Sequence, residues 1–176
     1  MLNTLISSKT RLKLLLKFFL NPSSRSYLRG LESEFGESTN AIRLELNRFE
    51  DAGLLNAEAK GNKKMYGVNT QHPFFAPIQS MIRNYVGIDH LINNVLSKLG
   101  DVHSVYLTGD WARGIESNII DIVIIADNIN STYLTNLTHK AEEVLNRKIR
   151  FVVYTIDEWK TNPLVNDEIL LIYGEE

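Results

Sequence analysis

The residues best able to support chemistry lie between Leu107 and Ile125, in the stretch LTGDWARGIESNIIDIVII. A glycine turn, Gly109-Asp110, separates an expected strand from a short helix, and Asp121 stands in a second apolar strand. Backbone N–H groups at the start of a helix favour anions such as phosphate, but the carboxylate of Asp110 opposes an anion there. Arg113 most simply anchors the turn or a nearby carboxylate. The stretch therefore has the form of a phosphate-binding turn with a charge that disfavours phosphate.

Acidic side chains in the same stretch leave a metal site open as an alternative. Asp110 could act with Asp121 and Glu116 as ligands of a divalent cation, because carboxylate oxygens suit Mg²⁺. The chain has no cysteine, so a thiolate zinc site and a disulfide framework are both excluded. The residue pattern alone assigns no metal site.

A second group of residues, within the first 70, suits nucleic acid. Arginine can bond guanine or phosphate with two parallel hydrogen bonds, and asparagine can do the same with adenine. Lysines at the tip of a hairpin suit phosphate, which adds affinity without sequence information. The alternative is that these side chains form only the solvated face of a surface helix and a charged hairpin tip. The predicted DNA contacts are Thr39, Asn40, Arg43, Leu44, Asn47 and Arg48 on one helix and Lys60, Lys63 and Lys64 on the hairpin.

The elements that would position these residues follow from apolar periodicity and turn signals. In the helix that Ser38-Thr39 opens, the apolar residues Ile42, Leu46 and Phe49 recur at i, i+4 and i+7. The order helix, helix, tight turn, helix, hairpin is that of a winged helix-turn-helix unit. The predicted helices are 8–20, 26–35 and 39–51, and the predicted hairpin strands are 54–59 and 64–68.

The rest of the chain alternates between strands and helices. A long helical stretch, 74–99, is expected to break near Gly87 and to pack on both of its neighbours. Strands alternating with helices predict a small α/β domain. The predicted strands are 102–108, 119–126 and 149–155, and the predicted helices between them are 111–115 and 131–146.

Composition and charge set bounds on these assignments. With 176 residues, 44% of them hydrophobic and 23% charged, the chain has the composition of an ordinary globular protein. Residues 1–70 hold eleven basic and seven acidic residues, whereas residues 71–176 hold eight and fourteen. This asymmetry indicates a domain boundary and, weakly, a nucleic-acid partner. The short apolar runs and the lack of cysteine predict a cytoplasmic protein without membrane contact.

The whole chain resembles a family of prokaryotic transcriptional regulators that fuse an ArsR-like winged helix to a minimal nucleotidyltransferase-like domain of the DNA polymerase β superfamily. Active members of that superfamily hold nucleotide phosphates at a Gly-Ser turn and two divalent metals on three carboxylates. Carried over by position, the first carboxylate is Asp121, the second falls on Val123, and the third falls on or near Arg150. Arg150 could instead neutralise Asp121 or Asp110 in a structural ion pair. The segments that carry the resemblance are STNAIRLELNRFEDAGLL, GNKKMYGVN, LTGDWARG with DIVII, and NRKIRFVVYTIDEW.

The resemblance implies an α+β protein: a winged helix-turn-helix domain at 1–70, a helical connector at 71–100, and a nucleotidyltransferase-like domain with a small mixed sheet at 101–176. The leading hypothesis is a transcriptional regulator of double-stranded DNA, expected to form a homodimer. Its second domain would be a catalytically degenerate fold for dimerisation or for sensing a nucleotide or small-molecule effector. No cofactor is expected. The alternatives are a Mg²⁺-dependent nucleotidyltransferase localised by the winged helix, and an antitoxin-type partner protein.

Overall fold

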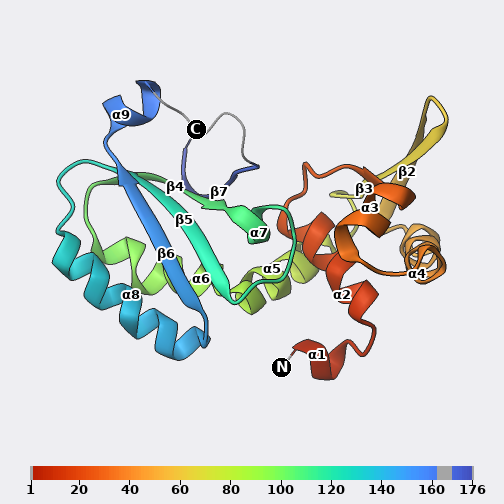
Figure 1. Ribbon diagram of the computed structural model, residues 1–176, viewed down its shortest axis with the longest axis horizontal. Coiled ribbons are helices and arrows are strands. Elements are labelled where there is room, and N and C mark those ends of the chain that lie inside the picture. Colours follow the sequence, from red (N-terminus) through yellow and green to blue (C-terminus); the bar gives the residue numbers. More distant parts are fainter. Residues whose placement is uncertain (1, 162–167, 176) are drawn as a thin grey trace. The chain divides into compact units, whose positions relative to one another are not determined.

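The computed structural model describes residues 2–161 and 168–175 of the chain (Figure 1). They form a mixed α/β structure with two sheets. The chain divides into two compact units, unit 1 (Met1–Tyr85) and unit 2 (Val86–Glu176). The division falls within the expected connector 71–100, at the end of its first helix, so all but the last residue of that helix belongs to unit 1. Each unit is therefore described by itself.

The helices of unit 1 begin and end at recognisable capping residues. The hydroxyl of Ser8 accepts a hydrogen bond from the backbone of Arg11, and that of Ser38 accepts one from the backbone of Ala41. Such side-chain acceptors satisfy N–H groups that the first helical turn leaves without partners. Gly36 ends its helix in the left-handed conformation, with φ of 62°. The helices are α1 (Leu2–Leu5), α2 (Lys9–Leu15) with a π-helical continuation (Leu16–Leu20), α3 (Leu28–Phe35), α4 (Thr39–Asp51) and α5 (Phe75–Val86).

The sheet of unit 1 is antiparallel, in the order β1-β3-β2. Its strands are β1 (Ser26–Tyr27), β2 (Leu55–Lys60) and β3 (Lys63–Val68), and the last two form the expected hairpin. Ser26 pairs with Tyr66 and Tyr27 with Met65, so α3 begins two residues later than predicted. The core beneath these elements includes the fully buried residues Leu14, Phe18, Leu31, Ile42 and Leu46.

Unit 2 contains a mixed sheet in the order β6-β5-β4-β7. β5 and β6 are parallel, whereas β4 is antiparallel to both β5 and β7. The strands are β4 (Val102–Thr108), β5 (Ile119–Ala126), β6 (Lys148–Tyr154) and β7 (Leu170–Gly174). The helices are α6 (Ile88–Asn94), a 3₁₀ turn (Leu96–Lys98), α7 (Gly109–Ala112), α8 (Ser131–Leu145) and α9 (Ile156–Thr161).

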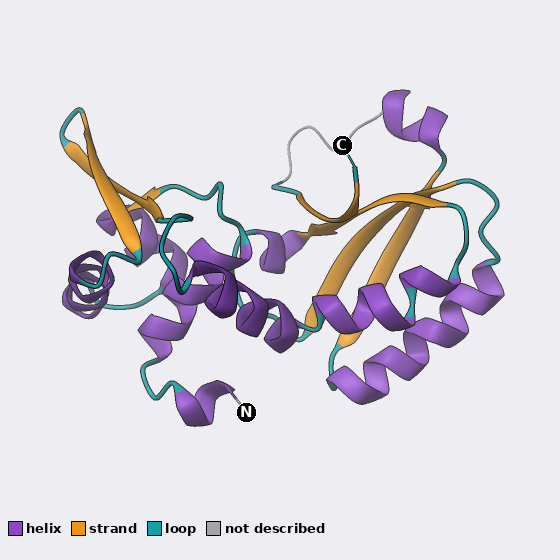
Figure 2. Ribbon diagram, turned by 180° about the vertical axis from the view of Figure 1, so that it is seen from behind, coloured by secondary structure: helices purple, strands orange, loops and turns teal. Residues whose placement is uncertain are grey.

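The two faces of this sheet have different covers. Helices α6 and α8 lie along one face (Figure 2). On the other face, Tyr106, Val123 and Ile125 form an apolar cluster with α9, where Trp159 stacks on Tyr106 with ring centroids 5.3 Å apart. Because side chains alternate between faces along a strand, Asp121 lies on the same face as Val123. The strand thus places Asp121 beside an apolar cluster.

The expected break in the stretch 74–99 is present, because Gly87 has φ of 101° and separates α5 from α6. Two other details differ from the sequence-based expectations. The short helix after β4 is Gly109–Ala112 rather than 111–115, since the chain turns into it at Gly109 itself. Neither α9 nor β7 was predicted. Among the described residues, no helix has the length and apolar character needed to cross a membrane.

Candidate functional site

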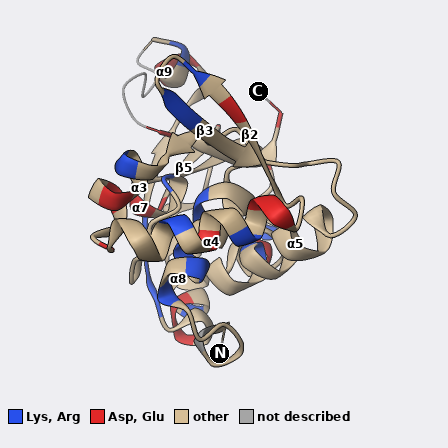
Figure 3. Ribbon diagram, turned by 90° about the vertical axis from the view of Figure 1, so that its right-hand side faces the viewer, with Lys and Arg blue, Asp and Glu red and all other residues tan. Residues whose placement is uncertain are grey.

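The predicted recognition helix, α4, has a buried and an exposed face. Ile42, Glu45, Leu46 and Phe49 are buried. The opposite face carries most of the residues predicted to contact DNA, and Figure 3 shows that basic segments recur along α4. Thr39 is half-buried, and the exposed residues are Asn40, Arg43, Leu44, Asn47 and Arg48. The helix therefore presents two arginines and two asparagines to solvent on a well-packed base.

A cavity of about 580 Å³ lies between α4, the start of α3 and the hairpin. Its cationic lining residues are Arg29, Arg43, Lys63 and Lys64, and no acidic residue of the described chain lines it. Sequence reasoning missed Arg29, because only the pairing of β1 with β3 places the start of α3 beside the hairpin. The cavity also contains Asn47, so a basic groove adjoins the exposed face of α4.

The three hairpin lysines have different surroundings. The Nζ atom of Lys63 lies 4.0 Å from the centre of the Tyr27 ring, a cation–π contact with the start of α3. The Nζ atom of Lys64 donates to Glu50 of α4 at 2.7 Å, and this bond raises the pKa of Lys64 above its ordinary value. Lys60 is exposed. Two of the three lysines therefore also hold the hairpin against neighbouring elements.

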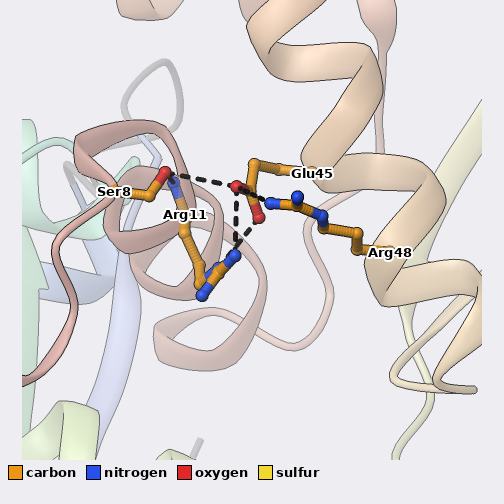
Figure 4. Close-up of polar contacts among 4 residues, drawn as sticks. All are labelled: Ser8, Arg11, Glu45 and Arg48. Atoms are coloured by element: carbon orange, nitrogen blue, oxygen red, sulfur yellow. Dashed lines mark hydrogen bonds and ion pairs between the residues drawn. The ribbon is translucent and has the colours of Figure 1, made fainter.

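Glu45 is the buried acid of α4, with only 6% of its side chain exposed (Figure 4). Arg11 of α2 donates to it from Nε at 2.8 Å and from Nη2 at 3.2 Å. The Nη1 atom of Arg48 donates at 2.9 Å, and the Ser8 hydroxyl at 3.3 Å. Burial raises the pKa of the Glu45 carboxyl, but the bond and charge of Arg11 and the charge of Arg48 outweigh it and hold the pKa below its ordinary value. The carboxylate thus joins α2 to α4.

The second candidate site is a cavity of about 670 Å³ in unit 2, lined by residues of the Gly109 turn and of strands β5 and β6. Asp121 and Arg150 are partners in the parallel register. Arg150 donates to both carboxylate oxygens of Asp121, from Nε at 2.6 Å and from Nη2 at 2.9 Å. Its hydrogen bond to Asp121 raises the pKa of Arg150. Asp121 is therefore bound on both oxygens by a cation.

The glycine turn is closed against the same carboxylate. Gly109 has φ of 65°, and a Cβ atom there would lie 2.8 Å from Oδ2 of Asp121. The Nη2 atom of Arg113 donates to Asp110 at 2.5 Å, so that carboxylate also has a cation beside it. Both acids of the predicted site form ion pairs with arginines.

The remaining positions of the metal alternative do not supply ligands. Val123 is 3% exposed and belongs to the apolar cluster, and Glu116 lies 3.9 Å from Arg147. The described residues include no group of three or more histidine and acidic side chains that could hold a metal ion. A pair of divalent metals needs several carboxylates around it. The residues that line this cavity do not fit such a pair.

No family model and no curated protein matches the sequence. Among solved structures, reduced HlyU from Vibrio cholerae N16961 is 19% identical, with 47% of this chain and 79% of that chain covered and a TM-score of 0.36. A complex of a tri-AMPylated HEPN toxin with an MNT antitoxin from Shewanella oneidensis matches at 16% identity, covering 51% of this chain and 71% of that chain, with a TM-score of 0.38. A predicted DNA-binding transcriptional regulator from E. coli matches at 23% identity, covering 47% and 83%, with a TM-score of 0.37.

Proposed function

We propose that the protein is a DNA-binding transcriptional regulator that inserts α4 into the major groove. The observation that carries the proposal is the exposed face of α4 with the basic cavity beside it. Arg43 belongs to both, because it is exposed on α4 and lines the cavity. An α-helix fits the major groove, where side chains reach the base edges.

Contacts to DNA then divide by position. Asn40, Arg43 and Asn47 lie on the outward face of α4 and carry the donors and acceptors that read bases. Arg29 and Lys63 lie around the cavity at the edge of that face, where phosphates of the DNA backbone would approach. Base contacts give specificity, and phosphate contacts give affinity that depends on salt.

The test begins with in vitro selection of bound DNA at a stated salt concentration. Arg43→Ala should then weaken binding to the selected duplex by about 1–3 kcal/mol and relax its sequence preference. Lys98→Ala serves as the control, since Lys98 is exposed and belongs to unit 2. Unchanged affinity of Arg43→Ala, together with binding that does not depend on salt, would refute the proposal.

For unit 2 we propose a role that does not use metal-dependent nucleotidyl transfer. The support is the bidentate bond from Arg150 to Asp121 and the apolar side chain at Val123. In a sensing domain, the cavity of unit 2 would bind an effector that does not require a bound metal.

A direct assay separates this proposal from the enzyme alternative. The protein is incubated with Mg²⁺ and labelled nucleoside triphosphates, and label transferred to protein or to small molecules is measured. We expect no turnover above the level of Asp121→Ala. Turnover that Asp121→Ala abolishes would contradict the proposal and favour the enzyme.

A further inference from the structure

The exposed face of α4 has two flanks, and each flank holds an acid of α4 bonded to a cation from a neighbouring element. On the flank toward the hairpin, Glu50 accepts a bond from Lys64. On the flank toward α2, Glu45 accepts bonds from Arg11 and from Arg48. The α2 flank differs because two guanidinium groups share one carboxylate, which leaves a net charge of +1.

These two guanidinium groups have donors to spare. Arg11 uses Nε and Nη2 toward Glu45, and Arg48 uses Nη1. A guanidinium group has five N–H donors. Among the described residues, Nη1 of Arg11 and Nε and Nη2 of Arg48 have no hydrogen-bond acceptor. The side chains are 37% and 52% exposed, so these donors can reach a ligand from solvent.

We propose that Arg11 and Arg48 form a second contact site for the DNA backbone, on the flank of α4 opposite the hairpin, with Glu45 as their positioning residue. This proposal rests on the DNA-binding function proposed above. The chemistry recognised is a phosphate diester, since planar guanidinium groups bind phosphate oxygens with paired hydrogen bonds. Glu45 fixes the arginines before DNA arrives, and this reduces the side-chain entropy lost on binding.

The arrangement fits the geometry of a helix in the major groove. That groove is about 12 Å wide and has a phosphate backbone along each side. The cavity with Arg29 and Lys63 serves one backbone, and the Arg11–Arg48 pair serves the other. Asn40, Leu44 and Asn47 lie between the two flanks, at the position of the bases.

The test uses the full chain, a fluorescent duplex from the selection described above, and a scrambled duplex of the same length. Binding is measured over a series of salt concentrations, and log K is plotted against log[salt]. Arg11→Ala should reduce the slope by about one for both duplexes, because one phosphate contact is lost. Arg11→Lys, which keeps the charge, should retain the slope. Lys98→Ala reports the effect of removing one charge elsewhere in the chain.

Glu45→Gln tests the positioning role separately. It removes the charge that holds both arginines but leaves the arginines in place, so the slope should stay unchanged. The affinity for both duplexes should fall several-fold and to the same extent, because the two arginines are no longer fixed before DNA arrives and lose more side-chain entropy on binding. Thermal unfolding of each variant confirms that the chain is folded at the assay temperature.

The outcomes separate this inference from the proposed function. A wild-type slope in Arg11→Ala would overturn the backbone contact, as would equal losses of affinity in Arg11→Ala and Arg11→Lys without a change of slope. Wild-type affinity of Glu45→Gln for both duplexes would overturn the positioning role. If Arg43→Ala weakens binding while Arg11→Ala does not, the proposed function stands and the inference fails. If the wild-type chain shows no salt-dependent DNA binding, both fail.

Discussion

Glu45 in unit 1 and Asp121 in unit 2 are both carboxylates bonded by arginine, and the two sites differ in what remains unused. At Glu45 two arginines share one buried acid, so cationic donors remain exposed at the edge of α4. At Asp121 one arginine bonds both oxygens of the acid, so a cation already occupies this carboxylate. Pairing of arginine with a carboxylate thus leaves a surface suited to phosphate in unit 1 and occupies a possible metal ligand in unit 2.

Neighbouring side chains explain the difference. Glu45 lies on the buried side of α4, and only long side chains such as Arg11 reach it while keeping part of the guanidinium in solvent. Asp121 lies at the edge of an apolar cluster, next to Val123, and the parallel register sets Arg150 directly opposite. Glu45 therefore has two arginines because both α2 and α4 supply one, whereas Asp121 has the one arginine that the strand register sets opposite it.

The largest effect on stability is expected from Val123→Asp, which tests whether one added carboxylate is enough for unit 2 to hold a metal. A carboxylate at this buried position should destabilise unit 2 by on the order of 3–5 kcal/mol, because a buried charge without a partner is costly. Both tryptophans of the chain, Trp111 and Trp159, belong to unit 2, so tryptophan fluorescence during urea unfolding reports this unit.

Val123→Thr provides the matched control, since it keeps the branched shape and adds no charge. Mg²⁺ should not restore the stability of Val123→Asp, because Arg150 still bonds Asp121. A urea midpoint that rises with Mg²⁺ would show that the cavity can hold a metal, and it would contradict the contrast drawn between Asp121 and Glu45.

A smaller effect is expected from Glu45→Ala in unit 1. The loss should be about 1–3 kcal/mol, because bonds from Arg11, Arg48 and Ser8 disappear while the two arginines can rehydrate. Hydrogen exchange of the α4 amides measures it, since unit 1 contains no tryptophan. Glu58→Ala, at an exposed position of β2, should leave exchange unchanged. Equal exchange in the two variants would show that Glu45 does not join α2 to α4.

The pH dependence of unit 1 should show the same carboxylate. A carboxyl whose folded pKa is lowered stabilises the fold fully above its unfolded pKa, and this contribution is lost as pH falls through the folded pKa. For Glu45 the loss therefore occurs below the ordinary value of 4.5. Acid titration of α4 amide exchange should be less steep in Glu45→Gln than in the wild type. Identical titrations would mean that the arginines do not lower the pKa.

The smallest effect on stability is expected at the hairpin lysines, where an exposed lysine can be compared with one that is bonded to α4. Lys60→Ala should leave unfolding unchanged and reduce the salt slope of DNA binding by about one, because Lys60 is exposed. Lys64→Ala also removes the bond to Glu50, so it should additionally increase the exchange of amides near the end of α4. If neither lysine changes the slope, the hairpin does not contact the backbone.

Much of the fold could be predicted from local patterns. The α4 helix has a serine cap and apolar residues at helical spacing, and its predicted bounds match the structure. Strands β4 and β5 are long apolar runs and also match. The two-residue β1 is too short to show periodicity, and α3 was therefore extended over it. Local signals identify elements that are long enough to repeat a pattern.

The contacts of the candidate site depend on distant pairs, and these could not be predicted. Arg11 and Glu45 are 34 residues apart, and no local pattern relates them. In the sequence, Arg29 looks like any polar residue of a short helix, and only the pairing of β1 with β3 shows that it lies beside the hairpin. Arg150 is the exception, because the sequence already predicted an ion pair with Asp121 or Asp110, and the register shows both of its bonds to Asp121.

The pairing of Asp121 with Arg150 has a consequence for how this domain can change by mutation. Substituting a carboxylate for Arg150 alone would set two like charges on adjacent strands, and substituting one for Val123 alone would bury a charge among apolar side chains. Each single step toward an acidic cluster is therefore unfavourable. The ion pair and the apolar neighbour therefore both disfavour additional acids on this face of the sheet.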